Sequence, residues 1–145
     1  MKSNRNAQSR VEPVRTFTMP EGIQTCISKY SVEDSVSRLE SLLKEKGIKL
    51  FCLIDHSGEA AAAGLTMPPT KVLIFGNPKA GTPLMLSAPS VALDLPLRIL
   101  VAETPTGETQ LSWTDPTWLQ HRHNFPPELT PNLAAAGNFA KSLAT

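Results

Sequence analysis

The apolar residues of the chain fall into short runs with the spacing of β-strands and longer runs with the spacing of α-helices. In 23–29, apolar and polar residues alternate with a period of two, and 71–75 is almost continuously apolar. Runs of both kinds predict β-strands. The predicted strands are 23–29, 49–55, 71–75, 97–103 and 110–114. Pro105 and Gly107 predict a hairpin turn between the last two of these strands.

A first helix is predicted directly after the first strand, because apolar residues recur there every three or four positions. The residues of this buried stripe are Val32, Val36, Leu39 and Leu43. Ser31 precedes the stripe as an N-cap, and Asp34 follows three residues later in a pattern resembling a capping box. Gly47 supplies the C-terminal stop.

A last helix is predicted near the C-terminus, with Thr130 as its N-cap and Pro131 at its first helical position. Shorter helical turns are expected at 57–63, 83–87 and 116–121, and a loop at 76–82. The predicted order is β-α-β-β-β-β-α. This order indicates an α+β domain with one mostly antiparallel sheet and two main helices.

The second face of this sheet is predicted to be apolar. In 49–55, strict alternation places Leu50, Cys52 and Ile54 on one face and Phe51 and Leu53 on the other. Two helices cover only one face, so Phe51, Leu53, Leu100 and half of 71–75 are left uncovered. Large exposed apolar patches are unusual on monomers. A second copy of the chain, as a homodimer, or the proline-rich segment 83–96 is expected to cover them.

Composition adds limits to this picture. The chain has 145 residues, a net charge of +1 and 41 % hydrophobic residues, which is typical of one globular domain. Residues 1–20 are predicted to be a disordered basic tail, and 21–145 to be a single domain. No apolar stretch approaches the ~20 residues that a bilayer requires, and no secretory signal is present. We therefore expect no membrane partner and a cytoplasmic location.

Two further expectations follow from charge and cysteine content. A nucleic-acid surface is strongly basic, whereas the basic residues here are concentrated in the tail, so no nucleic-acid partner is expected. Cys26 and Cys52 do not form a C-x-x-C motif and are expected to be buried small side chains rather than a redox pair.

Three runs of the sequence together resemble the domain of unknown function 302 (DUF302) family: IDHS at 54–57, IFGNPKAGTPLM at 74–85 and LDLPL at 93–97. The resemblance extends over about 23–125. It implies an α+β fold likened to one half of the TATA-binding protein, often as a homodimer, and no established activity. Two residues depart from the family pattern, Trp113 where Tyr is more frequent and Pro68 where Arg is frequent, so a pocket role for either side chain is not carried over.

The segment Gly76, Asn77, Pro78, Lys79, Ala80, Gly81 and Thr82 has the pattern G-x-x-x-x-G-T. A phosphate-binding P-loop has Lys between the second Gly and the hydroxyl residue, and that Lys is missing here. Nucleotide hydrolysis is therefore excluded. Two interpretations remain. Free amides near Gly81 and Thr82, with the Lys79 ammonium, bind a small anion, or the segment only provides turn geometry.

Other polar residues give weaker candidates. His56 follows Asp55 at a strand end, which suggests an acid–base histidine, although adjacent residues on a strand point apart. Asp94 and Arg98 lie in an apolar stretch and are predicted to form an ion pair, a dimer contact or the floor of a pocket. His121 and His123 are too few ligands for a metal site, so no metal and no cofactor are expected.

Three functional hypotheses follow. The first is a homodimeric binding module for a small anionic ligand or a partner protein, with Gly76, Asn77, Lys79, Gly81 and Thr82 as contacts. The second is a small enzyme with His56 as acid–base and Lys79 as substrate anchor, which requires both side chains within ~3 Å reach of one substrate. The third is a purely structural interaction module.

Overall fold

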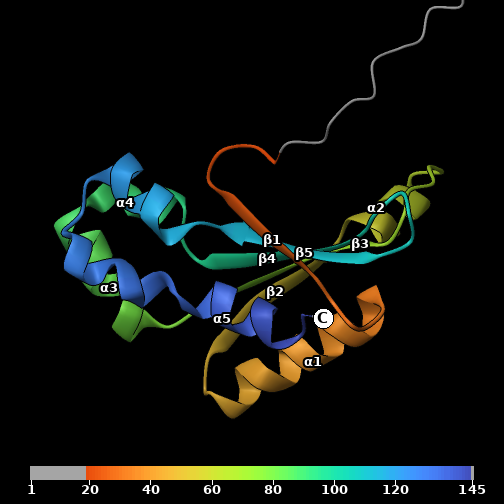
Figure 1. Cartoon of the computed structure of the whole chain (residues 1–145), viewed down its shortest axis with the longest axis horizontal. Coiled ribbons are helices and arrows are strands. Elements are labelled where there is room, and N and C mark those ends of the chain that lie inside the picture. Colours follow the sequence, from red (N-terminus) through yellow and green to blue (C-terminus); the bar gives the residue numbers. More distant parts are fainter. Residues whose placement is uncertain (1–18, 145) are drawn as a thin grey trace, which may run out of the picture.

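The computed structural model describes residues 19–144, which form one antiparallel five-stranded sheet with helices on one face and at both ends (Figure 1). The strand order is β1-β5-β4-β3-β2. The strands are β1 (Ile23–Ile27), β2 (Lys49–Asp55), β3 (Thr70–Gly76), β4 (Leu97–Glu103) and β5 (Thr109–Thr114). The predicted antiparallel α+β fold is therefore confirmed. The tail predicted for 1–20 falls almost wholly outside the described residues.

Five α-helices and two 3₁₀-helices accompany the sheet within the described residues. They are α1 (Val32–Glu45), α2 (His56–Ala62), α3 (Pro78–Ser87), η1 (Pro89–Leu93), α4 (Pro116–His123), η2 (Pro127–Leu133) and α5 (Ala135–Ser142). Helix α1 begins as predicted, because the Asp34 amide donates to the Ser31 hydroxyl over 3.1 Å. It ends just before Gly47, which adopts a left-handed φ of 66°.

Two predicted helix starts are wrong. The last helix begins at Ala135, and the expected cap residues Thr130 and Pro131 lie inside η2. Helix α3 begins at Pro78 rather than Pro83, so most of the predicted loop 76–82 is helical. Asn77 is the N-cap and Pro78 occupies the first turn, where its missing amide costs nothing.

Helices α1 and α5 pack on one face of the sheet (Figure 1). The main core lies between them and side chains with 0–5 % exposure from the inner strands. These side chains are Leu73, Phe75, Ile99, Val101, Leu111 and Trp113. A second, smaller core, here called the end core, joins α3, η1, α4 and η2 at one end of the sheet. Its buried residues are Leu84, Ala88, Val91, Leu119, Phe125 and Leu133.

A register shift between Leu50 and Cys52 overturns the predicted alternation of β2. Leu50 pairs with Phe75 on the helix-covered face, whereas Cys52 pairs with Ile74 on the opposite face. A β-bulge inserts one residue, and the residues beyond it change face. As a result, Leu53 pairs with the buried Leu73 rather than belonging to the second face.

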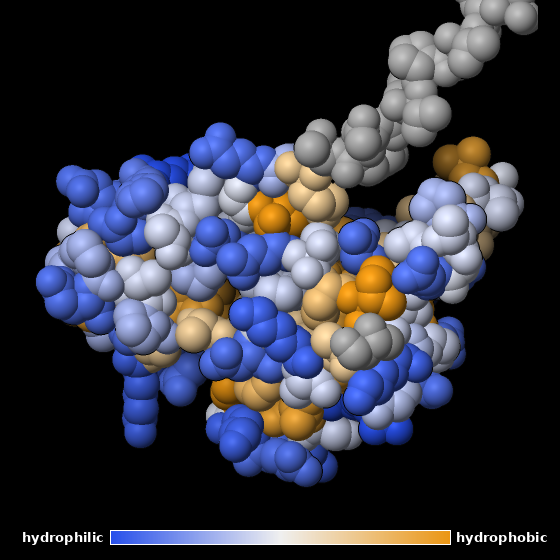
Figure 2. Space-filling view, in the orientation of Figure 1, coloured by the Kyte–Doolittle hydropathy of each residue, from blue (hydrophilic) through white to orange (hydrophobic). Residues whose placement is uncertain are grey.

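The second face, here called the open face, presents apolar residues in register across the sheet. Ile54, Val72 and Leu100 form one row, and all three are half-buried. Cys52 is exposed in the next row, contrary to the expected burial, and Phe51 is 49 % exposed. In the view of Figure 2, apolar side chains appear as separate patches among polar ones. The apolar part of this face is limited to β2, β3 and β4, because Leu100 pairs with Ser112 and Ser112 pairs with Thr25, and Leu53 does not belong to it.

Candidate functional site

A pocket of about 240 Å³ lies where the end of β3, the first turns of α3 and the segment before β4 meet η2. An engineered cavity of ~150 Å³ accommodates benzene, so this volume suits a small molecule of one or two rings. The residues lining it are Phe51, Gly76, Asn77, Pro78, Ala80, Gly81, Thr82, Met85, Ala92, Leu95, Pro96, Leu97, Asn132 and Leu133. Most of these side chains are apolar, which is typical of ligand pockets.

Two glycines keep this pocket open. A Cβ on Gly81 would lie 3.5 Å from Leu95 Cδ1 and 3.9 Å from Met85 Cε, and both of those residues line the pocket. A Cβ on Gly76 would lie 3.4 Å from the Phe51 ring and 3.5 Å from Pro96. Any larger side chain at these positions would occupy the space that the pocket now offers.

In the segment 76–82, the backbone amides expected to bind an anion are already hydrogen-bonded within the protein. The Lys79 amide donates to Asn77 Oδ1 over 3.0 Å, and the amides of Ala80 and Gly81 donate to the Asn77 carbonyl. Pro78 has no amide to donate. The amide of Gly81 predicted to be free for an anion is therefore already occupied. Of the five predicted contacts, Gly76, Asn77, Gly81 and Thr82 line the pocket, whereas Lys79 is exposed and does not.

Asn132 is a pocket residue that the sequence did not single out. Its Nδ2 donates to the Ala80 carbonyl over 3.0 Å, which ties η2 to α3. Its Oδ1 carries no proton and is able only to accept a hydrogen bond. The local sequence TPNL gives no sign of this role, because it depends on the packing of η2 against α3.

His56 and Asp55 lie at the other end of the β2–β3 hairpin. Asp55 pairs with Lys71 and Lys49 pairs with Gly76, so five residue steps of β3 separate the two ends. At ~3.3 Å per residue this is about 17 Å. Helices α2 and α3 accordingly lie apart in Figure 1. His56 and Lys79 therefore do not share a substrate, and the enzyme hypothesis that joined them is wrong.

Asp55 has a structural role instead. Its carboxylate accepts from the Ser57 hydroxyl over 2.6 Å and from the Gly58 amide over 2.9 Å, and it caps α2. These two hydrogen bonds, the Ser57 bond first, hold the pKa of Asp55 below its ordinary value of 3.8. The ionised form is thus the one that the folded protein prefers.

We expect Asp55→Ala to lower the melting temperature by a few degrees near neutral pH, because the cap of α2 is lost. The pKa is depressed on folding, so this stabilisation is present above 3.8 and is lost as the pH falls through the folded value. Thermal unfolding across pH measures it, with Glu59→Ala as the control in the same turn. A wild-type to Asp55→Ala difference that grows on acidification would contradict the assignment.

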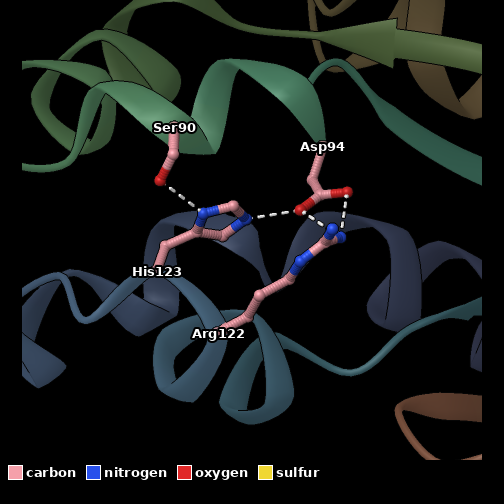
Figure 3. Close-up of polar contacts among 4 residues, drawn as sticks. All are labelled: Ser90, Asp94, Arg122 and His123. Carbon is pink, nitrogen blue, oxygen red and sulfur yellow. Dashed lines mark hydrogen bonds and ion pairs between the residues drawn. The ribbon is translucent and has the colours of Figure 1, made fainter.

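Asp94 and Arg98 line one hollow of about 230 Å³, but they do not form the predicted ion pair. Asp94 instead accepts from Arg122 Nη1, at 3.0 Å for each carboxylate oxygen, and from His123 Nε2 (Figure 3). The Nδ1 atom of His123 is 2.7 Å from the Ser90 hydroxyl. The sequence gives no sign of this role for Ser90, because 33 residues separate it from His123.

Within residues 19–144, no three His, Cys, Asp or Glu side chains are arranged to hold a metal ion. Cys26 is half-buried beside the main core, and burial raises the pKa of its thiol. The same described part of the chain contains no helix that is both long and apolar enough to cross a membrane.

Comparison with known proteins gives a consistent picture. The sequence profile of domain of unknown function DUF302 matches residues 24–142. The crystal structure of an uncharacterised conserved DUF302 protein from Bacillus stearothermophilus superposes with a TM-score of 0.67 and 22 % identity, covering 86 % of this chain and 94 % of that one. This likeness supports the fold. The likeness to half of the TATA-binding protein stays a prediction.

Two curated relatives are proteins named fluoride-specific ion channels. One, from Brucella suis biovar 1, is 38 % identical over 113 residues, which is 78 % of this chain and 44 % of that protein. The other, from Brucella melitensis biotype 1, is 38 % identical over the same length and is covered to 42 %. The chain therefore spans less than half the length of these relatives.

Proposed function

The chain belongs to the DUF302 family, and from this premise we propose that it is a binding protein for a small molecule with an apolar body. The pocket between α3, the segment before β4 and η2 carries this proposal. It combines a mostly apolar wall with a few polar side chains, those of Asn77, Thr82 and Asn132, which is the usual composition of a ligand site. The glycines at 76 and 81 leave the space free.

The pocket favours an uncharged ligand over the anion expected from the sequence, because no charged side chain lines it. The amides of Lys79, Ala80 and Gly81 are already bonded to Asn77. The polar side chains left to meet a ligand are those of Asn77, Thr82 and Asn132, and all three are uncharged. An anionic ligand would depend on the exposed Lys79 ammonium, and Lys79→Ala tests that dependence directly.

We expect Gly81→Leu to reduce ligand retention at least tenfold, because the new side chain would fill the pocket beside Leu95 and Met85. Native mass spectrometry of the full chain purified from lysate measures any retained mass. Ala61→Leu is the control, since it adds the same side chain on the exposed surface of α2, at the other end of the sheet. Retention equal to wild type in a folded Gly81→Leu protein would remove the pocket as the site.

We also propose that a second copy of the chain covers the open face. The row Ile54, Val72 and Leu100 supports this, because its residues are half-buried, whereas the central residues of the helix-covered face, Leu73, Ile99 and Val101, are fully buried. Phe51 borders both the open face and the pocket, so a partner there would close over the ligand. The same mass spectra give the subunit count, and a single-chain mass at every concentration would contradict this proposal.

The named channels among the relatives suggest a setting for this binding function. An ion channel needs membrane-spanning segments, and the described residues contain no helix suited to that role. We propose that the segment shared with those channels is an accessory ligand-binding domain rather than the pore. The cytoplasm remains the predicted location for this chain.

A further inference from the structure

A cluster of four polar side chains lies between η1 and α4, outside the proposed ligand pocket (Figure 3). Ser90 comes from the first turn of η1 and Asp94 from its C-terminal cap, while Arg122 and His123 come from the last turn of α4. The His123 side chain is only 4 % exposed, yet both of its ring nitrogens have partners.

The partners of His123 fix its tautomer. The Asp94 carboxylate accepts a hydrogen bond and cannot donate one when ionised, so Nε2 carries the ring proton. In a neutral ring, Nδ1 is then an acceptor. The Ser90 hydroxyl, 2.7 Å away, therefore donates its hydrogen bond to Nδ1, which acts as the base. Arg122 holds the carboxylate through both oxygens, which fixes its orientation.

From this geometry we propose that Ser90 is an activated nucleophile that cleaves carboxylic esters. A hydroxyl bonded to a neutral imidazole, which is itself oriented by a carboxylate, is the arrangement that activates serine in hydrolases. Here the carboxylate contacts Nε2 and the serine contacts Nδ1, the reverse of the serine-protease arrangement. Either ring nitrogen is able to accept the proton.

The reaction is balanced with water as the only co-reactant. Ser90 Oγ bonds to the ester carbonyl carbon, its proton moves to His123 Nδ1, and the carbon–oxygen bond to the alcohol breaks as the alcohol takes that proton. Water then gives a proton to Nδ1 and attacks the acyl-serine. The carboxylic acid leaves, and the proton returns to Ser90. Because Ser90 is exposed, the substrate reaches Oγ from solvent.

The same contacts also describe a clasp that only joins η1 to α4, and reactivity separates the two roles. The full chain is incubated with a fluorophosphonate probe, whose phosphorus–fluorine bond breaks as the serine oxygen bonds to phosphorus, and is analysed by intact mass and peptide mapping. We expect one adduct, on Ser90. Ser90→Ala removes the hydroxyl that contacts His123 Nδ1 and should abolish the adduct, whereas Ser87→Ala, at an exposed serine on α3, should not.

Removal of the base provides the second test. His123→Ala is expected to slow labelling about 100-fold or more, the usual contribution of a general base, and imidazole added to the buffer should restore part of the rate. Asp94→Asn should slow labelling without such rescue, because Asp94 acts only by positioning His123. Hydrolysis of p-nitrophenyl acetate should follow the same order. No adduct at Ser90, or equal labelling of His123→Ala, would show that the cluster is a clasp and overturn the proposal.

Discussion

Phe125→Ala is expected to lower the free energy of unfolding by about 3–5 kcal/mol, the usual cost of deleting a buried aromatic ring. The Phe125 side chain is 1 % exposed and belongs to the end core with Leu84, Val91 and Leu119. The cavity would open beneath α3, which lines the pocket, and α4, which carries Arg122 and His123. Denaturant unfolding measures the loss of stability.

Hydrogen exchange measures which helices and strands lose amide protection in Phe125→Ala. The end core is separate from the main core, although Leu97 packs against both. Amides of α3 and α4 should therefore lose protection well before those of β3 and β4. Phe51→Ala is the control, because that ring is 49 % exposed and its removal should cost far less. Equal costs for the two variants, or uniform loss of protection, would mean that the two cores unfold as one unit.

The parts of the fold that local pattern determines were predicted from the sequence. Strands β2 and β4 have the predicted bounds, and α1 begins after Ser31 and ends just before Gly47 as expected. Each of these elements is determined by its own residues, through apolar periodicity and end signals. The bulge near Phe51 was not predicted, because strict alternation was assumed and only pairing with β3 shows the extra residue.

The sequence singled out the segment beside the pocket but did not predict the hydrogen bonds of its amides. The segment 76–82 does border the pocket, yet Asn77 and Pro78 start a helix there and Asn77 occupies the amides that an anion would need. Pro83 misled the prediction, since a proline is more frequent in the first turn of a helix than inside one. The contacts of His123 with Ser90 and Asp94 depend on the packing of α4 against η1. No local sequence pattern predicts that packing.

Gly22→Ala is expected to lower the free energy of unfolding by about 2–5 kcal/mol, for two separate reasons. Gly22 has a left-handed φ of 82°, which costs an L-residue ~1–2 kcal/mol. In addition, a Cβ there would lie 2.5 Å from Trp118 Cδ2 and 2.7 Å from Cγ, within the rigid indole ring. Forcing an atom into such packing costs a further ~1–3 kcal/mol.

Gly107→Ala separates these two contributions. Gly107 has a nearly identical φ of 84°, but a Cβ there would meet nothing within 4 Å, so only the backbone strain should appear. The excess cost of Gly22→Ala over Gly107→Ala, measured by denaturant unfolding, then reports the packing of Trp118. Trp118 lies beside Arg122, whose Cζ is 5.5 Å from the ring centroid, and Arg122 in turn holds Asp94. Equal costs for the two variants would show that the indole moves freely. A clear excess would mean that the turn before β1 fixes Trp118 and, through Arg122, supports the orientation of the Asp94 carboxylate.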